Sequence, residues 1–384
     1  MRTLIRGASA VVSGLAAAPL LDADALIVDG TLIEQVGPVS TLDTAVDRVI
    51  DVNGAVLAPG LIDPHTHPVL GDFTPRQNTL GWVGSHLNGG VTTLISAGET
   101  HWPGRQRTPI GAKAIAIAAA LSSAQLRPSG AKLHGGALLI EPGLGPADFD
   151  EMAAAGVRLV GEVGLGSSMD PERIREPIEL ARSRGWVVPM HVGGASVPGS
   201  HVVGSDMVLE LRPDVVCHAN GGPTARPLHE IEEILAETES VLEVVQAGNT
   251  WALTRIVTRL LELGRLDRLQ FGTDSPSGTG ILPLGMLRTL AYSAAFAGLD
   301  PATALCLASG SVAARYGLDV GVIAPGCPAD LVVLDVPLGG QGEIAFDSFR
   351  HGDVPSVALV MVDGEVLVRP SRVTPPPTRA PLIS

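Results

Sequence analysis

Residues 59–67 of this 384-residue chain read Pro-Gly-Leu-Ile-Asp-Pro-His-Thr-His, and this stretch decides how the rest of the sequence is interpreted. It completes an apolar run, predicted as a strand over 56–62, and ends in two histidines two positions apart. Residues i and i+2 of an extended chain point to the same side, so the imidazoles of His65 and His67 can converge on one point. The stretch therefore predicts a buried strand with a histidine pair at its carboxyl end.

Further apolar runs follow this strand and alternate with segments of helical periodicity. The predicted strands cover 56–62, 91–96, 132–140, 158–162, 187–191, 215–218, 242–246 and 269–273, and the predicted helices cover 75–87, 109–125, 146–154, 171–184, 206–211, 227–237, 251–263 and 283–297. Nearly continuous apolar strands are typical of a parallel sheet that is covered on both faces. Eight strand–helix units predict the α/β class and a closed (β/α)₈ barrel of the TIM type. An open dinucleotide-binding sheet would need a Gly-x-Gly-x-x-Gly turn after the first strand, and that turn is missing.

The two ends of the chain have a different texture, with short alternating strands and Asp-Gly turns at 29–30 and 363–364. We predict that 1–55 and 320–384 pair into one small composite β-sandwich domain, and that 56–319 form the barrel domain. The apolar run 7–21 is open to interpretation as a secretory signal or as strand. It is short, contains glycine and proline, and continues into more strand pattern, so strands over 3–12 and 24–36 are favoured.

Composition excludes several classes of protein. The 40 acidic and 26 basic residues give a net charge of −14, which disfavours a surface that binds nucleic-acid phosphates. No segment reaches the roughly 20 apolar residues that span a membrane. The three cysteines are far apart in the sequence and suit a reducing compartment, so we expect a cytoplasmic protein whose partner is a small-molecule substrate.

Polar side chains recur where the predicted strands end, and in a (β/α)₈ barrel these ends all face the same mouth. The residues are His65, His67, Glu162, His191, His218 and Asp274. Imidazoles combined with carboxylates suit zinc or iron(II) better than magnesium or calcium. Six ligands exceed one tetrahedral site, so we expect two divalent metal ions about 3.5–4 Å apart that share a carboxylate and a hydroxide. The other histidines are expected in structural roles. This expectation is weakest for His101 and His134, because they lie close to the ends of the second and third predicted strands.

Together with Ala-Asp-Leu-Val-Val at 329–333, these residues resemble the amidohydrolase superfamily over the whole chain. The loop segments 71–77, 101–105, 161–166, 220–224 and 274–280 are similar to a branch of that superfamily that opens cyclic amides. The resemblance implies a hydrolase of carbon–nitrogen bonds with a cyclic enamide substrate, 6-oxo-1,4,5,6-tetrahydronicotinate. Three alternatives stay open, namely a hydrolase of another cyclic amide, imide or lactam, a deaminase with one metal, and a non-catalytic binding or assembly protein on the same scaffold.

The two lysines of the chain, Lys113 and Lys132, distinguish it within that superfamily. Many binuclear members bridge their metals with a carbamylated lysine at the end of the fourth strand, where this chain has Glu162. The resemblance therefore implies that Glu162 bridges the two metals. It also implies that one metal is bound by His65, His67 and Asp274 and the other by His191 and His218. Asp274 is further implied as the catalytic base, which passes a proton to the leaving nitrogen.

Two arginines are candidates for binding a substrate carboxylate, because a guanidinium can hold it with two hydrogen bonds. Arg76 and Arg105 follow the first and second predicted strands, and the alternative for both is a surface salt bridge. The resemblance further implies a homotetramer. A predicted helical segment over 112–124 is apolar nearly all round and must be buried against something.

Overall fold

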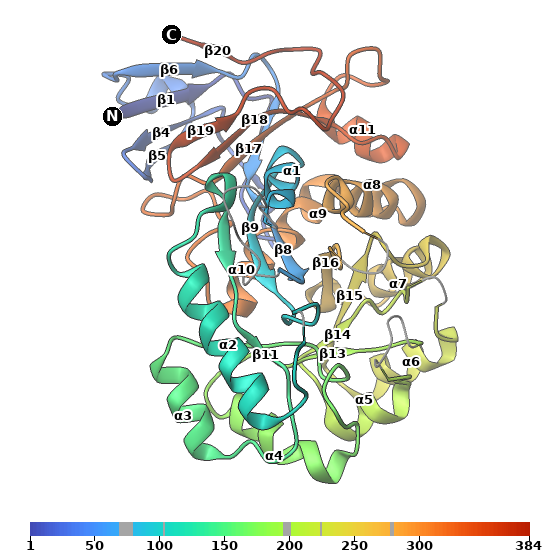
Figure 1. The fold of residues 1–384 in the computed structure, drawn as a ribbon. Helices are drawn as coiled ribbons and strands as arrows, with labels where there is room; N and C mark the ends of the chain where they lie inside the picture. The colour runs from blue at the N-terminus through green and yellow to red at the C-terminus, as the bar shows by residue number, and fades with distance from the viewer. Residues whose placement is uncertain (69–79, 103, 195–200, 223–224, 277–279) are drawn as a thin grey trace.

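The computed structural model describes residues 1–68, 80–102, 104–194, 201–222, 225–276 and 280–384. Figure 1 shows a body of strands and surrounding helices, with sheets from the two chain ends packed against one end of it. The strands of this body are β8 (Leu61–Thr66), β9 (Val91–Ser96), β10 (Lys132–His134), β11 (Ala137–Leu138), β12 (Leu159–Val160), β13 (Pro189–His191), β14 (Val215–Cys217), β15 (Val241–Val245) and β16 (Leu269–Gly272).

All pairings between these strands are parallel. The order β10-β9-β8, the pair β11-β12 and the order β13-β14-β15-β16 account for most of the ring. A parallel bridge between Val163 and Met190 joins β12 to β13, and another between Thr66 and Ser275 joins β16 to β8. The ring is therefore closed, and the predicted (β/α)₈ barrel is confirmed.

Helices cover the outside of the ring (Figure 1). They are α1 (Trp82–Asn88), α2 (Pro109–Ser123), α3 (Pro146–Ala154), α4 (Pro171–Arg182), α5 (Ser205–Leu211), α6 (Leu228–Glu237), α7 (Thr250–Glu262) and α8 (Gly285–Ala297), followed by α9 (Pro301–Leu307) and α10 (Gly310–Tyr316). The starts of α2, α4 and α9 have a Thr or Asp whose side chain accepts a backbone N–H, followed directly by proline. Both devices stabilise a first helical turn, which explains why the starts of α2 and α4 were predictable.

Two strands predicted for the barrel are broken by glycines. The strand predicted over 56–62 divides at Gly60 into β7 (Val56–Pro59), which belongs to a sheet outside the barrel, and β8. A Cβ atom at position 60 would lie 2.2 Å from Thr92 Oγ1, so only glycine fits this crossing. The strand predicted over 132–140 divides into β10 and β11 around Gly136, whose φ of +88° is left-handed. Of the helix predicted over 75–87, residues 75–79 lie outside the described residues.

The sheets at the end of the barrel combine both ends of the chain. One has the order β20-β6-β1-β4-β5 and the other the order β19-β18-β17-β7-β2-β3. Their bounds are β1 (Arg2–Arg6), β2 (Ala10–Val12), β3 (Leu20–Leu21), β4 (Ala25–Asp29), β5 (Leu32–Gly37), β6 (Arg48–Asp51), β17 (Leu331–Asp335), β18 (Ser356–Val362), β19 (Glu365–Val368) and β20 (Leu382–Ile383). A buried apolar cluster that includes Ile5, Leu57 and Val333 draws on both sheets.

The remaining elements are α11 (Ala345–His351) and the short 3₁₀ helices η1 (Val39–Thr41), η2 (Pro128–Gly130) and η3 (Leu266–Arg268). The strand predicted over 3–12 divides at Gly7, whose φ is +76°, into β1 and β2, which belong to different sheets. The run 7–21, for which a secretory signal was the alternative, carries β2 and β3. In the described part of the chain, no helix has both the length and the apolar character needed to cross a membrane.

Candidate metal centre

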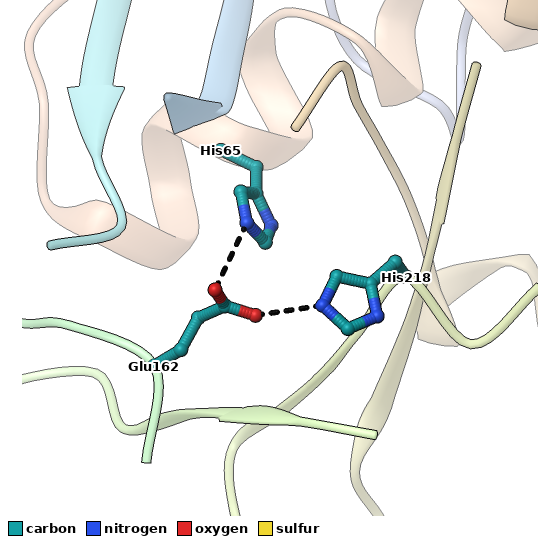
Figure 2. A group of neighbouring side chains, drawn as sticks. All are labelled: His65, Glu162 and His218. Carbon is teal, nitrogen blue, oxygen red and sulfur yellow. Dashed lines mark hydrogen bonds and ion pairs between the residues drawn. The ribbon is translucent and has the colours of Figure 1, made fainter. Parts of the chain in front are cut away.

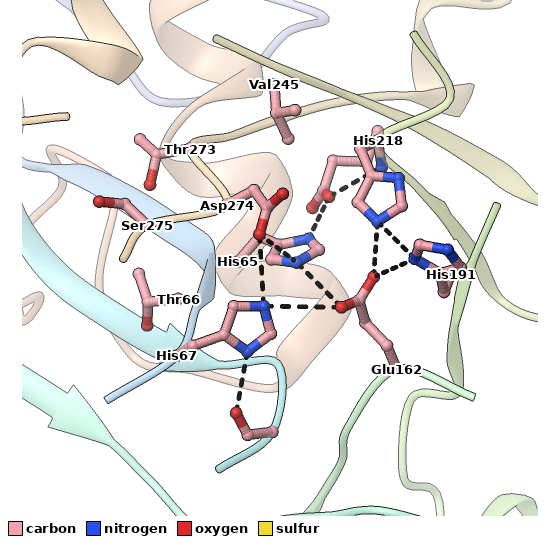
Figure 3. Close-up of polar contacts among 12 residues, drawn as sticks. His65, Thr66, His67, Glu162, His191, His218, Val245, Thr273, Asp274 and Ser275 are labelled. Carbon is pink, nitrogen blue, oxygen red and sulfur yellow. Dashed lines mark hydrogen bonds and ion pairs between the residues drawn. The ribbon is translucent and has the colours of Figure 1, made fainter. Parts of the chain in front are cut away.

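The six strand-end side chains predicted as ligands meet at one mouth of the barrel (Figure 3). His65 lies in β8 and His67 directly after it, and the other four lie at or just after the ends of four different barrel strands. Five of them are buried, whereas the Asp274 side chain is 21% exposed. The strand-end pattern therefore identified residues that the fold brings into contact.

The buried side chain of Asp63 fixes the backbone at this mouth by hydrogen bonds. One oxygen of Asp63, Oδ1, accepts the N–H groups of His65 (3.2 Å) and Thr273 (3.1 Å), and Oδ2 accepts the Thr273 hydroxyl at 2.5 Å. These bonds tie β8 to the end of β16. Asp274 follows with a φ of +56°, a strained conformation that is concentrated at functional sites in proteins.

Glu162 lies at the centre of the group (Figures 2 and 3). Its Oε2 atom is 3.4 Å from His65 Nε2 and 3.5 Å from His67 Nε2. Its Oε1 atom is 2.8 Å from His218 Nε2 and 3.9 Å from His191 Nδ1. One carboxylate thus stands between two histidine pairs, with one oxygen toward each pair.

The donor atoms fit a transition metal. Ligand atoms of His65, His67 and Asp274 lie within 4.8 Å of one another, as do those of His65, Glu162 and His218. His65 Nε2 is buried and has no hydrogen-bond partner among the described residues, an unusual state for a polar atom. A nitrogen- and carboxylate-rich group with an unsatisfied imidazole nitrogen at its centre suits zinc or iron(II).

Hydrogen bonds on the far side of each ring aim the imidazoles of β8. His67 Nδ1 lies 2.9 Å from the carbonyl oxygen of Gly98, and His65 Nδ1 lies 2.5 Å from Glu243 Oε1. Both rings therefore turn Nε2 toward Glu162. Glu243 was not identified as a site residue from the sequence, where the available signal was a single charge inside the apolar strand 241–245.

The histidines and carboxylates change one another's pKa values. Burial raises the pKa of the Glu162 carboxyl, but the charges of His65 and His218 outweigh it and hold that pKa well below its usual range. Burial likewise raises the pKa of Asp274, and the hydrogen bond with His67 brings it below the ordinary value. Both carboxylates are therefore ionised at neutral pH and available to a cation.

The candidate substrate arginines differ in what the structure shows of them. Arg105 Nη2 donates to the carbonyl oxygen of Leu165 at 3.1 Å, in the loop that follows Glu162. Arg76 lies outside the described residues. Of the two uncertain histidines, exposed His101 has its ring centre 5.8 Å from that of His67, whereas His134 lines a separate cavity of about 390 Å³.

A (β/α)₈ barrel with a histidine- and carboxylate-lined mouth defines the class of metal-dependent hydrolases, and the chain belongs to the amidohydrolase family. Residues 257–367 match the family model. The chain is 45% identical over 380 residues to enamidase from Eubacterium barkeri, which covers 99% of this chain and 98% of that protein. It superimposes on a crystal structure of enamidase, a member of the amidohydrolase superfamily, with a TM-score of 0.95 over the whole of both chains. The predicted superfamily resemblance is confirmed.

More distant proteins are similar to the chain in sequence or in fold. Adenine deaminase from Deinococcus deserti is 29% identical over 86% of this chain, but the chain spans only 56% of that enzyme's length. A putative prolidase from Bifidobacterium longum superimposes with a TM-score of 0.62 at 20% identity.

Proposed function

We propose that this protein opens a six-membered cyclic amide by hydrolysis, in the manner of enamidase, with 6-oxo-1,4,5,6-tetrahydronicotinate as the type of substrate. The observation that carries the proposal is the position of Glu162 between two histidine pairs at the mouth of the barrel. The full-length similarity to enamidase supports the reaction type.

We infer that the centre holds two divalent ions, zinc or iron(II). His65, His67 and Asp274 would hold one ion, His191 and His218 the other, with Glu162 shared between them. Such a pair of ions supplies two effects when bound, a lowered pKa of the attacking water and polarisation of the amide carbonyl.

Asp274 is the proton carrier in this proposal. Its carboxylate is partly exposed at the mouth, while its Oδ1 atom remains 3.3 Å from His67 Nε2. An ionised carboxylate in this position accepts a proton from the attacking water and delivers it to the leaving nitrogen. A bond forms between the water oxygen and the carbonyl carbon, the ring carbon–nitrogen bond breaks, and an enamine carboxylate results.

The wider setting is also part of the proposal. We infer a composite β domain from 1–55 and 320–384 beside a barrel domain from 56–319, supported by sheets that mix strands from both ends. The free cysteines Cys217, Cys306 and Cys327 support a cytoplasmic location.

We further infer a homo-oligomer, with a tetramer as the expected size. One face of α2 supports it, because Ile110 is 71% and Leu121 56% exposed, and the alanines at 114 and 118 between them are exposed too. Exposed apolar stripes of this kind mark interaction surfaces. Sedimentation of a monomer would contradict the inference.

Metal analysis and a substrate screen test the proposed reaction. We expect about two metal ions per chain, and turnover of six-membered cyclic amides that is faster when the ring carries a carboxylate. Glu162→Gln should lose metal and activity, whereas Glu230→Gln, a change in a buried glutamate of α6, should retain both. Full activity after chelation and dialysis would exclude the proposal.

Two further outcomes of the screen distinguish the alternatives. Turnover of an imide or lactam in preference to cyclic enamides would reassign the substrate while keeping the chemistry. Ammonia release from adenine with about one metal per chain would instead favour a deaminase, the activity named for several of the distant relatives.

A further inference from the structure

A chain of hydrogen bonds runs from the metal centre into the interior of the barrel. Glu243 on β15 is 1% exposed, and its Oε1 atom lies 2.5 Å from His65 Nδ1. Its Oε2 atom accepts a hydrogen bond from Gln270 Nε2 on β16 at 2.9 Å. Gln270 Oε1 in turn accepts from Arg315 Nη1 on α10 at 2.5 Å.

The donors and acceptors along this chain have one consistent arrangement. An ionised carboxylate only accepts, so both His65 Nδ1 and the Gln270 amide must donate to Glu243. The amide oxygen of Gln270 is then left to accept from Arg315. Because His65 donates through Nδ1, the proton that a metal ion would displace from the charged ring is the one on Nε2, the buried atom without a hydrogen-bond partner among the described residues.

The two histidines of β8 differ in their support. His67 is held by the neutral carbonyl of Gly98, whereas His65 is held by a carboxylate that is itself fixed by an arginine-anchored amide. A carboxylate makes the imidazole a stronger electron donor than a carbonyl does, besides orienting it. Gly272 leaves room for this arrangement, because a Cβ atom there would lie 3.0 Å from His65 Cβ and 3.1 Å from Glu243 Oε2.

We propose that Glu243 is a positioning residue that fixes the orientation and raises the metal affinity of His65, with Gln270 and Arg315 holding it in place. The inference rests on the metal centre proposed above. Glu243, Cys217 and His65 also place ligand atoms within 4.8 Å of one another. The Nδ1 atom of His65 is already bound to Glu243, however, so this group supports His65 rather than holding an ion of its own.

Metal affinity tests the inference without relying on activity. Metal-free protein is titrated with zinc in competition with a chromogenic chelator. When the residue that accepts a hydrogen bond from a metal-bound histidine is substituted, metal binding typically weakens about 10- to 100-fold. We expect Glu243→Gln to bind one of its two zinc equivalents more weakly by this factor. Excess zinc should restore kcat with KM unchanged, and Glu243→Asp, which keeps the charge, should recover part of the affinity.

A buried carboxylate far from the centre provides the matched control. Asp335, at the end of β17, is fully buried and paired with Arg379. The Asp335→Asn protein should bind both zinc equivalents with wild-type affinity. If Glu243→Gln does not fold, Gln270→Met removes the support of Glu243 instead and should weaken the same equivalent by a smaller factor.

The outcomes separate the two proposals. If Glu243→Gln binds both zinc equivalents with wild-type affinity, the proposed role of Glu243 is wrong but the metal centre is not. The same result for Gln270→Met has this meaning if Glu243→Gln does not fold. Failure of the wild-type protein to bind zinc would overturn the metal centre itself.

Discussion

At the scale of single residues, Asp274 differs from the other five candidate ligands because part of its carboxylate is exposed at the mouth. Asp274→Asn keeps the shape of the side chain but cannot accept a proton. Since a positioned acid–base group contributes about 10²- to 10⁴-fold to a rate, we expect kcat to fall by that factor. Steady-state kinetics on a cyclic enamide measure the change.

Two measurements on the Asp274→Asn protein make the result specific. The kinetics are measured with metal in excess and the bound metal is counted, because an amide oxygen is a weaker ligand than the carboxylate for the ion that Asp274 would hold. The thermal melting temperature should stay close to that of the wild type. Retention of more than about a tenth of kcat would show that another group moves the proton.

Arg105 provides the second prediction at this scale. A hydrogen bond to a charged group contributes about 1.5–3 kcal/mol, so Arg105→Gln should raise KM for a ring with a carboxylate about 10- to 100-fold. For the same ring without the carboxylate, KM should not change. Equal effects on both substrates would assign Arg105 to the support of the Leu165 loop, to which it donates a hydrogen bond.

Whether a site residue could be predicted from the sequence depends on its position in its strand. The candidate ligands at strand ends could be identified from the sequence, because a polar residue directly after an apolar run breaks the pattern of a buried strand. Glu243 lies within a strand, and its contact with His65 joins positions 178 residues apart. Such a contact depends on the order of strands around the closed ring, which periodicity does not determine.

At the scale of elements, the break between β10 and β11 makes a stability prediction. Gly136 has a φ of +88°, and a Cβ atom there would lie 2.7 Å from both Ala116 O and Ala120 Cβ on α2. Gly136→Ala should lower the free energy of unfolding by about 1–2 kcal/mol for the left-handed backbone and about 1–3 kcal/mol more for the overlap. Chemical denaturation followed by circular dichroism measures it.

Gly156 is the matched control for that substitution. Its φ is +90°, but no described atom lies within 4 Å of the Cβ position. Gly156→Ala should therefore show only the backbone cost. Equal losses for the two variants would mean that the α2 contact does not require glycine.

His86 on α1 gives a pH prediction. It is fully buried, with Nδ1 3.4 Å from the Trp82 carbonyl oxygen, and burial lowers its pKa from 6.5 to about 4. Between these values the unfolded chain binds a proton that the folded protein does not, so stability falls as the pH is lowered from 6.5 to 4. A pKa difference of this size corresponds to about 3 kcal/mol.

Substitution of His86 isolates this contribution. The stability advantage of the wild type over His86→Gln should shrink by about 3 kcal/mol between pH 7 and pH 4, measured by denaturant unfolding at several pH values. Leu87→Val, a change in the buried neighbour that carries no titratable group, should give a difference that is independent of pH. A pH-independent difference for His86→Gln would contradict the prediction.

The elements themselves were largely predictable. Amphipathic helices with capped starts, such as α3 and α4, begin at the predicted residues because proline and the capping side chain act locally. The helices α9 and α10 were not predicted. Both have only seven residues and α9 is buried almost throughout, so neither presents the polar face that periodicity detects.

At the scale of the whole molecule, one lysine joins the barrel to the sheets at its end. The Nζ atom of Lys132, at the start of β10, lies 2.7 Å from Asp330 Oδ2 and 2.7 Å from Asp363 Oδ1. The side chains of Lys132 and Asp330 are 9% and 1% exposed. Burial raises the pKa of Asp330 even though the Lys132 ammonium acts in the opposite direction. The aspartate therefore depends on the lysine for its charge.

Lys132→Met should destabilise the protein by about 3–5 kcal/mol, because it leaves the buried carboxylate of Asp330 without a cation. Asp330→Asn added to Lys132→Met should recover part of that loss. The other lysine is a matched control, since Lys113 pairs with Asp148 and Glu151 at the partly exposed surface, and Lys113→Met should change stability little. Calorimetric melting of the variants measures these effects. The kcat of Lys132→Met at 25 °C should equal that of the wild type, because Lys132 lies at the opposite end of its strand from the mouth of the barrel. Equal melting temperatures for Lys132→Met and Lys113→Met would show that the ion pair does not hold the barrel and the sheets together.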